Sequence, residues 1–179
     1  MHRIPTLAAL AATLALAACA MPGANPPPAA AKASAMLLPT QGSQASGAAT
    51  FQAVPQGLSV HVHVTGVAPN SEHGFHLHEK GDCSAPDGTS AGGHFNPSGS
   101  PHGPQDGPHH AGDMPALKAD AQGVVDASFT LGGVGIGAGA GANDIVKRAV
   151  ILHAAPDDYR TQPTGNSGAR IACGVVEAG

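Results

Sequence analysis

Glycine and proline occur so often along this chain that they leave little room for helices. There are 25 glycines and 16 prolines among the 179 residues, and both residue types favour turns over helix interiors. The segments between them are short and apolar. The clearest is residues 58–67, where three valines alternate with polar side chains that include His61 and His63, as in a half-buried strand. Many short strands joined by turns predict an all-β domain, either a sandwich or a barrel.

Other segments extend this pattern along the chain. Further strands are predicted at residues 50–54, 74–78, 116–119, 124–130, 145–153 and 169–176. Two long segments, 79–115 and 154–168, lack strand alternation and are rich in glycine, proline, aspartate and histidine. Long ordered loops of this kind usually carry function.

The N-terminal region has the features of an export signal. Residues 1–18 combine a short basic start with an apolar stretch too short to span a bilayer. Residues 16–19, Leu-Ala-Ala-Cys, resemble the lipobox of bacterial lipoproteins, in which the cysteine carries lipid. We therefore expect a lipidated Cys19, a Pro/Ala-rich tether over 19–47 and a folded domain over 48–179. The alternative is an ordinary secretory signal with an incidental cysteine.

The cysteine count and the charge limit the environment and the partners. Three cysteines in an exported chain leave one unpaired unless something uses it. Lipidation of Cys19 leaves Cys83 and Cys173, either as two free thiols or as a pair that an oxidising compartment would keep closed. The formal net charge of −4, with only 8 basic residues, does not indicate a nucleic-acid partner.

Histidines carry the functional signal. His76 and His78 lie at i and i+2, on one face of a strand. His61 and His63 have the same spacing, and we interpret them as part of a solvated strand face. The first pair is followed by His94, His102, His110, Asp113 and His153. Three imidazoles with one carboxylate suit tetrahedral zinc, and four imidazoles without a thiolate suit Cu(II), so a two-metal set is predicted.

Five motifs resemble those of copper/zinc superoxide dismutase, in family order. They are GFHLHE at 74–79, GGHFNP at 92–97, HAGD at 110–113, His153 followed by Asp157, and GARIACG at 168–174. The resemblance runs from about residue 49 to the C-terminus. It implies an eight-stranded Greek-key barrel or immunoglobulin-like sandwich with two long functional loops.

The resemblance also implies the site. Copper, one per chain, would be held by His76, His78, His94 and His153. Zinc, one per chain, would be held by His94, His102, His110 and Asp113. His94 would be the imidazolate bridge and Asp157 the carboxylate that ties a copper histidine to a zinc histidine. Arg170 would dock the anion beside copper, and Cys83 and Cys173 would form the intrachain disulfide.

The implied activity is conversion of superoxide to dioxygen and hydrogen peroxide by Cu(II)/Cu(I) cycling beside a structural zinc, protecting the cell envelope from exogenous superoxide. The alternative function is a copper/zinc-binding envelope lipoprotein without turnover, but metal storage has no need of a cation such as Arg170 beside copper. Because the substrate is an anion and the chain is acidic overall, a local positive field must guide it. Lys80 is a candidate for steering, although a solvated lysine is the simpler interpretation.

The sequence departs from the cytosolic eukaryotic branch between Asp157 and Arg170. This segment is shorter and carries Asp158, Tyr159 and Arg160 in place of an acid/lysine cluster, which fits a bacterial exported branch of the family. We therefore expect a periplasmic or extracytoplasmic protein that is attached to a membrane only through Cys19. Both a monomer and a homodimer remain open. Two histidines beside the ligands match no metal position: we expect His109 to face solvent and His73 to be hydrogen-bonded near the site.

Overall fold

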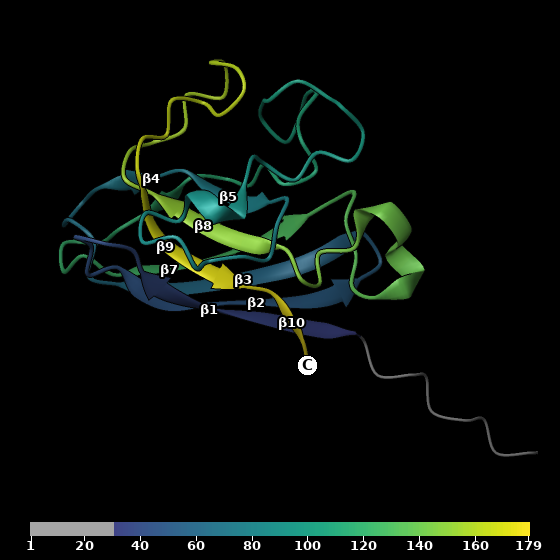
Figure 1. The fold of residues 1–179 in the computed structure, drawn as a ribbon, viewed down its shortest axis with the longest axis horizontal. Helices are drawn as coiled ribbons and strands as arrows, with labels where there is room; N and C mark the ends of the chain where they lie inside the picture. Colours follow the sequence, from purple (N-terminus) through teal and green to yellow (C-terminus); the bar gives the residue numbers. More distant parts are fainter. Residues whose placement is uncertain (1–30) are drawn as a thin grey trace, which may run out of the picture.

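The computed structural model describes residues 31–179, which form a curled antiparallel sheet with two long loops on one side (Figure 1). The predicted export signal and Cys19 lie outside these residues. The strands are β1 (Lys32–Pro39), β2 (Ser46–Val54), β3 (Gly57–Thr65), β4 (Glu72–His73), β5 (Phe75–His78), β6 (Leu117–Lys118), β7 (Val125–Leu131), β8 (Ala149–His153), β9 (Arg170–Val175) and β10 (Glu177–Ala178). Two 3₁₀ helices, η1 (Thr89–Ala91) and η2 (Ala138–Asn143), lie in connections.

Eight of these strands belong to one sheet, in the order β5-β8-β9-β1-β2-β3-β7 with β10 paired to β1, and β4 pairs with β6. β1 joins the part of the sheet made of β2, β3 and β7 to the part made of β5, β8 and β9, because residues 32–37 pair with β2 while Leu38 and Pro39 pair with β9. The prediction of an eight-stranded all-β fold with two long loops is confirmed. None of the helices among the described residues is long and apolar enough to cross a membrane.

The core follows the alternation expected from the sequence. On β3, Leu58 and the three valines are buried while His61 and His63 are exposed. β5 and β8 are buried along their whole length. Phe75 and Leu77 of β5 enter the main core, whereas His76 and His78 point to the opposite face. The outer side of this part of the sheet is therefore covered by the loops, and it is where the histidines gather.

The predicted tether over 19–47 is wrong in its second half. Residues 32–39 form β1, in which Ala33, Ala35 and Leu37 are buried and alternate with exposed residues. Small side chains made this segment resemble a linker, but it pairs with β2 over residues 32–37, with β10 at Ala33 and Ser34, and with β9 at Leu38 and Pro39. The folded domain therefore includes residues well before 48.

Most predicted strands have shifted ends. β6 covers only Leu117 and Lys118 of the predicted 116–119, and β8 begins at Ala149 instead of residue 145. Lys147 has a φ of 63°, which a strand cannot accommodate. The short strands β4 and β10 were not predicted, since two residues give no alternation to detect.

Candidate metal centre

The first group of histidines is built largely on strands. His76 and His78 are on β5, which pairs with β8, and His153 is the last residue of β8. His94, from the loop 79–115, forms a β-bridge with His78. One ligand nitrogen from each of these four histidines lies within 4.8 Å of the others, and all four side chains are buried. We call this set the copper-type cluster.

Each histidine of the copper-type cluster has one ring nitrogen without a hydrogen-bond partner. His76 Nε2 bonds to Asp157 Oδ2 (2.7 Å), His78 Nδ1 to the Gly92 carbonyl (2.9 Å) and His153 Nδ1 to the Gly168 carbonyl (3.2 Å). The remaining atoms, His76 Nδ1 and the Nε2 atoms of His78, His94 and His153, are buried and unpaired. Buried polar atoms are rarely left unsatisfied, so four converging lone pairs fit a metal ion.

The second group lies on the loop 79–115 and surrounds one carboxylate oxygen. Asp113 Oδ1 is 2.9 Å from His94 Nδ1, 3.0 Å from His102 Nδ1 and 3.3 Å from His110 Nδ1. His102 Nδ1 makes no well-directed hydrogen bond despite this short contact. The other oxygen, Oδ2, accepts from the backbone N–H groups of Gly103 and His110. We call this set the zinc-type cluster: three nitrogens and one oxygen, as tetrahedral zinc prefers.

Two residues connect the clusters. His94 belongs to both, because Nδ1 faces Asp113 while Nε2 is free on the copper-type side. Asp157, from the loop 154–168, bonds His76 Nε2 through Oδ2 and His102 Nε2 through Oδ1 (2.9 Å). A carboxylate on the far nitrogen of a ligand histidine fixes the tautomer and the ring orientation. The expected role of Asp157 therefore has the geometry that it needs.

Burial keeps three of the copper-type histidines neutral. Burial lowers the pKa of His76 to about 4, of His78 to about 2 and of His153 to about 3. Neutral imidazole is the form that binds a metal. Burial alone would raise the pKa of Asp113, but the close contact with His102 and the hydrogen bond from His94 hold that pKa well below its usual range. The same balance, with His102 and His76 as donors, lowers the pKa of Asp157.

His102 differs from the copper-type histidines. Burial would lower its pKa, but the adjacent Asp113 carboxylate and the hydrogen bond to Asp157 outweigh it and raise the pKa of His102 to about 9. In the absence of a metal this ring therefore carries the charge that compensates two buried carboxylates. A cation at Asp113 would replace that charge, which again fits a metal site.

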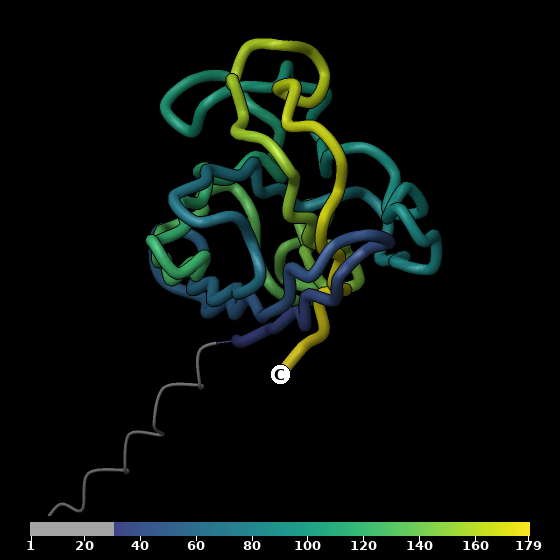
Figure 2. Tube along the Cα trace, turned by 90° about the vertical axis from the view of Figure 1, so that its left-hand side faces the viewer, coloured from purple at the N-terminus to yellow at the C-terminus, as the bar shows by residue number. Residues whose placement is uncertain are grey.

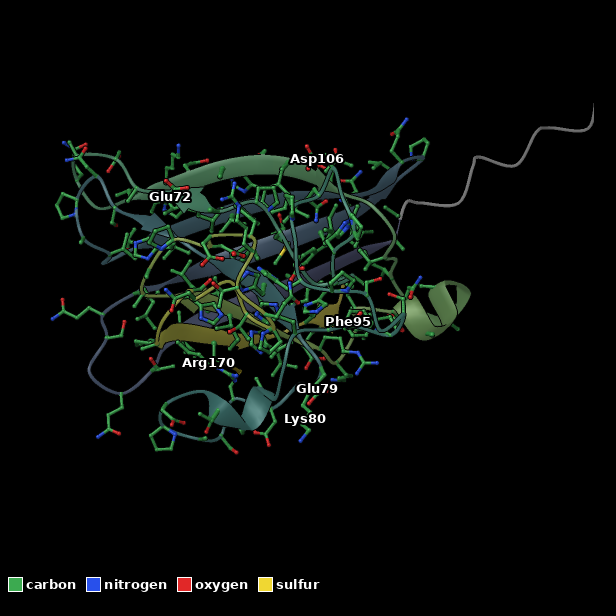
Figure 3. All side chains as sticks on the ribbon, turned by 90° about the horizontal axis from the view of Figure 1, so that it is seen from above. Glu72, Glu79, Lys80, Phe95, Asp106 and Arg170 are labelled. Carbon is green, nitrogen blue, oxygen red and sulfur yellow. A yellow bond between two sulfur atoms is a disulfide. The ribbon has the colours of Figure 1, made fainter. Side chains whose placement is uncertain are left out.

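Arg170 borders the copper-type cluster. Its Nη1 and Nη2 atoms each donate to a backbone carbonyl at 2.6 Å, of Gly88 and Gly92 respectively. The Gly92 carbonyl also bonds His78 Nδ1, so a single carbonyl joins the arginine to a copper-type ligand. Figure 3 shows Arg170 beside the segment that carries Glu79 and Lys80. The guanidinium is half-buried, which lowers its pKa without removing its charge.

The Cys83–Cys173 disulfide is present, with a Cα–Cα distance of 5.8 Å and a sequence separation of 90 residues. It attaches the loop 79–115 to β9, three residues beyond Arg170. Under this bridge, Ala91, Ala149 and Ile151 form a small second core. The loop that holds Arg170 in place is thus fixed covalently to the strand that carries Arg170.

The other four histidines within residues 31–179 are separate from both clusters. His61 and His63 are exposed and contact the carboxylate of Asp126 at 3.0 and 3.5 Å, as expected for a solvated strand face. His73 is buried, and its Nδ1 bonds the carbonyl of His153 (2.7 Å), so the expected bond near the site exists. His109 is only half-exposed and bonds the Gly107 carbonyl through Nδ1. Lys80 is exposed, and its side chain extends away from the barrel (Figure 3).

Sequence reasoning did not single out Gly165, which packs against the carboxylate between the clusters. It has a φ of +63°, and a Cβ there would lie 1.8 Å from Asp157 Oδ1 and 2.5 Å from His102 Nε2. Only glycine fits at this contact. One glycine among 25 gives no signal in the sequence that could have identified it.

Comparisons with known proteins agree with this geometry. The sequence model described as copper/zinc superoxide dismutase matches residues 45–176. Superoxide dismutase [Cu-Zn] 2 of Aquifex aeolicus is 41% identical over 150 residues, covering 81% of this chain and 86% of the relative. The superoxide dismutase-like protein YojM of Bacillus subtilis is 43% identical over 126 residues, which cover 68% of this chain and 63% of YojM.

Solved structures lead to the same family. The crystal structure of a SOD-like protein from Bacillus subtilis has a TM-score of 0.72 at 38% identity, covering 79% of this chain and 96% of the other. A double mutant of that protein gives the same TM-score at 39% identity, covering 79% of this chain and 95% of the mutant. Together with the two histidine clusters that share His94, these matches show that the chain belongs to the copper/zinc superoxide dismutase family.

Proposed function

We propose that this protein is a superoxide dismutase that holds one copper and one zinc ion. The observation that carries the proposal is a set of four buried imidazole nitrogens without hydrogen-bond partners, beside Arg170. One of these nitrogens belongs to His94, which is also part of the zinc-type cluster. Several curated relatives are named superoxide dismutase [Cu-Zn]. A copper ion supplies the one-electron couple that dismutation needs, whereas zinc has no redox chemistry.

The unpaired nitrogens indicate the copper ligands, and the atoms that converge on Asp113 Oδ1 indicate the zinc ligands. Copper would be held by His76 Nδ1, His78 Nε2, His94 Nε2 and His153 Nε2, and zinc by His94 Nδ1, His102 Nδ1, His110 Nδ1 and Asp113 Oδ1. In this assignment Asp157 orients a ligand of each ion. When no metal is bound to it, His94 Nε2 can hold a proton for the product, because His94 Nδ1 faces Asp113.

Arg170 gives the site its attraction for an anion. The formal net charge of the chain is −4, so the overall field opposes superoxide, and only a local positive charge can reverse this. The Gly88 and Gly92 carbonyls hold the guanidinium in place, and a half-buried charge is less screened than an exposed one. We therefore assign Arg170 as the residue that binds and orients the substrate.

One purified sample tests the function. Its copper and zinc contents and its rate of superoxide consumption should be measured together, before and after metal removal. We expect about one ion of each metal per chain, and activity that is lost on chelation and restored by copper. A protein that is fully loaded with both metals but does not consume superoxide would favour the alternative, a metal-binding protein without turnover.

Arg170→Glu tests the assigned substrate contact. Because focused charge raises association rates by factors of about 10 to 1,000, we expect turnover at low salt to fall by at least about 10-fold and its dependence on ionic strength to weaken. Lys32→Glu, the same charge change at an exposed position on β1, is the control. Equal effects of the two substitutions would show that only net charge matters and would remove Arg170 from the mechanism.

We also propose that the protein acts at the cell envelope, anchored through a lipid on Cys19. The lipobox-like sequence at 16–19 and the Cys83–Cys173 disulfide, which an oxidising compartment maintains, support this location. Because β1 begins at Lys32, the tether would be the segment between Cys19 and that strand. Cys19→Ser should abolish incorporation of labelled fatty acid and release the protein from the membrane fraction. Persistence in that fraction would contradict the anchor.

A further inference from the structure

We infer that Gln162 is a positioning residue that holds the zinc ligand His102 in place. The inference deepens the proposed function and rests on its zinc site. His102 lies in an irregular part of the loop 79–115, between Pro101 and Gly103 and outside every strand. His76 and His78, in contrast, lie on β5, whose backbone is paired with β8. The backbone of His102 therefore needs a partner other than a neighbouring strand.

Gln162 supplies that partner with a single side chain. Its Oε1 accepts from the His102 N–H at 2.8 Å, and its Nε2 donates to the His102 carbonyl at 2.8 Å. A primary amide has both functions in one plane, so it satisfies both backbone groups of one residue much as a paired strand would. The two residues are 60 positions apart in the sequence, and their contact brings the two long loops together, as Figure 2 shows.

The neighbours of Gln162 hold the imidazole of the same residue. Asp157 Oδ1 bonds His102 Nε2 at 2.9 Å. The Tyr159 ring lies parallel to the His102 ring, with an interplanar angle of 5°, and its hydroxyl accepts from the Ala116 N–H at 2.6 Å. Residues 157–162 thus contact the backbone and the ring edge of His102, and Tyr159 lies parallel to its ring with the centroids 6.5 Å apart. The remaining ring nitrogen, His102 Nδ1, points toward Asp113.

Loss of the Gln162 amide would free the backbone of His102 while leaving Asp157 in place. The ring would still be tied at Nε2, but the direction of Nδ1 would no longer be fixed from the backbone side. Because partners that orient a ligand affect metal affinity by about 10- to 100-fold, we expect Gln162→Met, which keeps the length of the side chain, to weaken zinc binding by roughly 10-fold.

The test uses zinc and its spectroscopic substitute Co²⁺ in the full protein. Zinc affinity is measured by competition with a chelator, and the visible absorption of Co²⁺ in the zinc-type cluster reports ligand geometry. We expect Gln162→Met to weaken zinc binding and to change the Co²⁺ spectrum, while copper binding at the strand-built cluster is retained. Gln52→Met, the same substitution at an exposed position on β2, is the control and should behave as the wild type.

Two further measurements separate the explanations. Gln162→Ala removes volume as well as hydrogen bonds, so similar losses in the Met and Ala variants support the hydrogen bonds, whereas a wild-type-like Met variant overturns the inference. If neither variant folds, amide exchange of His102 in the wild-type protein decides, since a fast-exchanging His102 N–H contradicts its bond to Gln162. A wild-type protein that binds no zinc would instead contradict the proposed function.

Discussion

The copper-type and zinc-type clusters are adjacent and share His94, but they are built in different ways. Three of the four copper-type histidines come from β5 and β8, whose backbones are paired with each other, and two of these three are oriented by backbone carbonyls. The zinc-type residues His102, His110 and Asp113 all come from one irregular loop. Among these three residues, His102 is the one held by side chains from the other loop, Asp157 and Gln162.

The difference indicates that the two ions need the fold in different ways. A strand places its side chains through backbone pairing, which the rest of the sheet stabilises. Asp113 and His94 of the loop are bridged to β5, but His102 has no such backbone pairing and depends on a few specific side-chain contacts. We therefore expect the copper-type cluster to resist changes in the loop 154–168, and the zinc-type cluster to respond to them.

Removing a ligand of copper alone should have the largest effect. In His153→Ala the copper-type cluster keeps three imidazoles, while the zinc-type cluster, which lacks His153, is complete. We expect superoxide consumption to fall to the level of the metal-free protein, with zinc content unchanged. His61→Ala, at an exposed histidine on β3, should leave both unaffected. Retained activity in His153→Ala would contradict the copper assignment.

Asp157→Asn should separate the clusters next most strongly. The amide cannot accept from both His76 and His102, so each ring loses part of its orientation. We expect zinc affinity to fall by about 10- to 100-fold and copper affinity to fall less, because β5 still positions His76. Chelator competition for each metal measures both effects. Asp106→Asn, at an exposed loop carboxylate, is the control, and equal losses for the two metals would contradict the distinction.

Gly165→Ala should have the smallest effect of the three. The new Cβ would collide with Asp157 Oδ1, and the alanine would have to adopt a positive φ. Such a backbone conformation costs about 1–3 kcal/mol. We expect a lower free energy of unfolding in urea and several-fold weaker zinc binding. Gly133→Ala is a matched control, because Gly133 also has a positive φ, of +73°, but nothing lies within 4 Å of a Cβ there. If stability and zinc affinity of Gly165→Ala equal those of the wild type, the loop 154–168 can change its conformation without affecting the zinc-type cluster.

The sequence predicted strands correctly where apolar and polar residues alternate clearly, and missed a strand where the alternation is weak. The alternation on β3 and the spacing of His76 and His78 correspond directly to strand faces. β1 was interpreted as tether, since its inward residues are mostly alanine and its role depends on pairing with β2, β9 and β10. Tertiary pairing, which composition does not reveal, made this segment a strand.

The sequence by itself determined the chemical types of the site, six imidazoles and one carboxylate. The resemblance of its motifs to the copper/zinc superoxide dismutase family implied that two metal ions share His94 and that Arg170 lies beside copper. The tertiary structure decided which nitrogen of each ring is free, because that depends on where Asp157 and the Gly92 and Gly168 carbonyls lie. It also decided that Gln162 and Gly165 contact residues of the site. The physical reason is that hydrogen-bond partners and close contacts between distant loops are fixed by packing in space and leave no periodic trace in the chain.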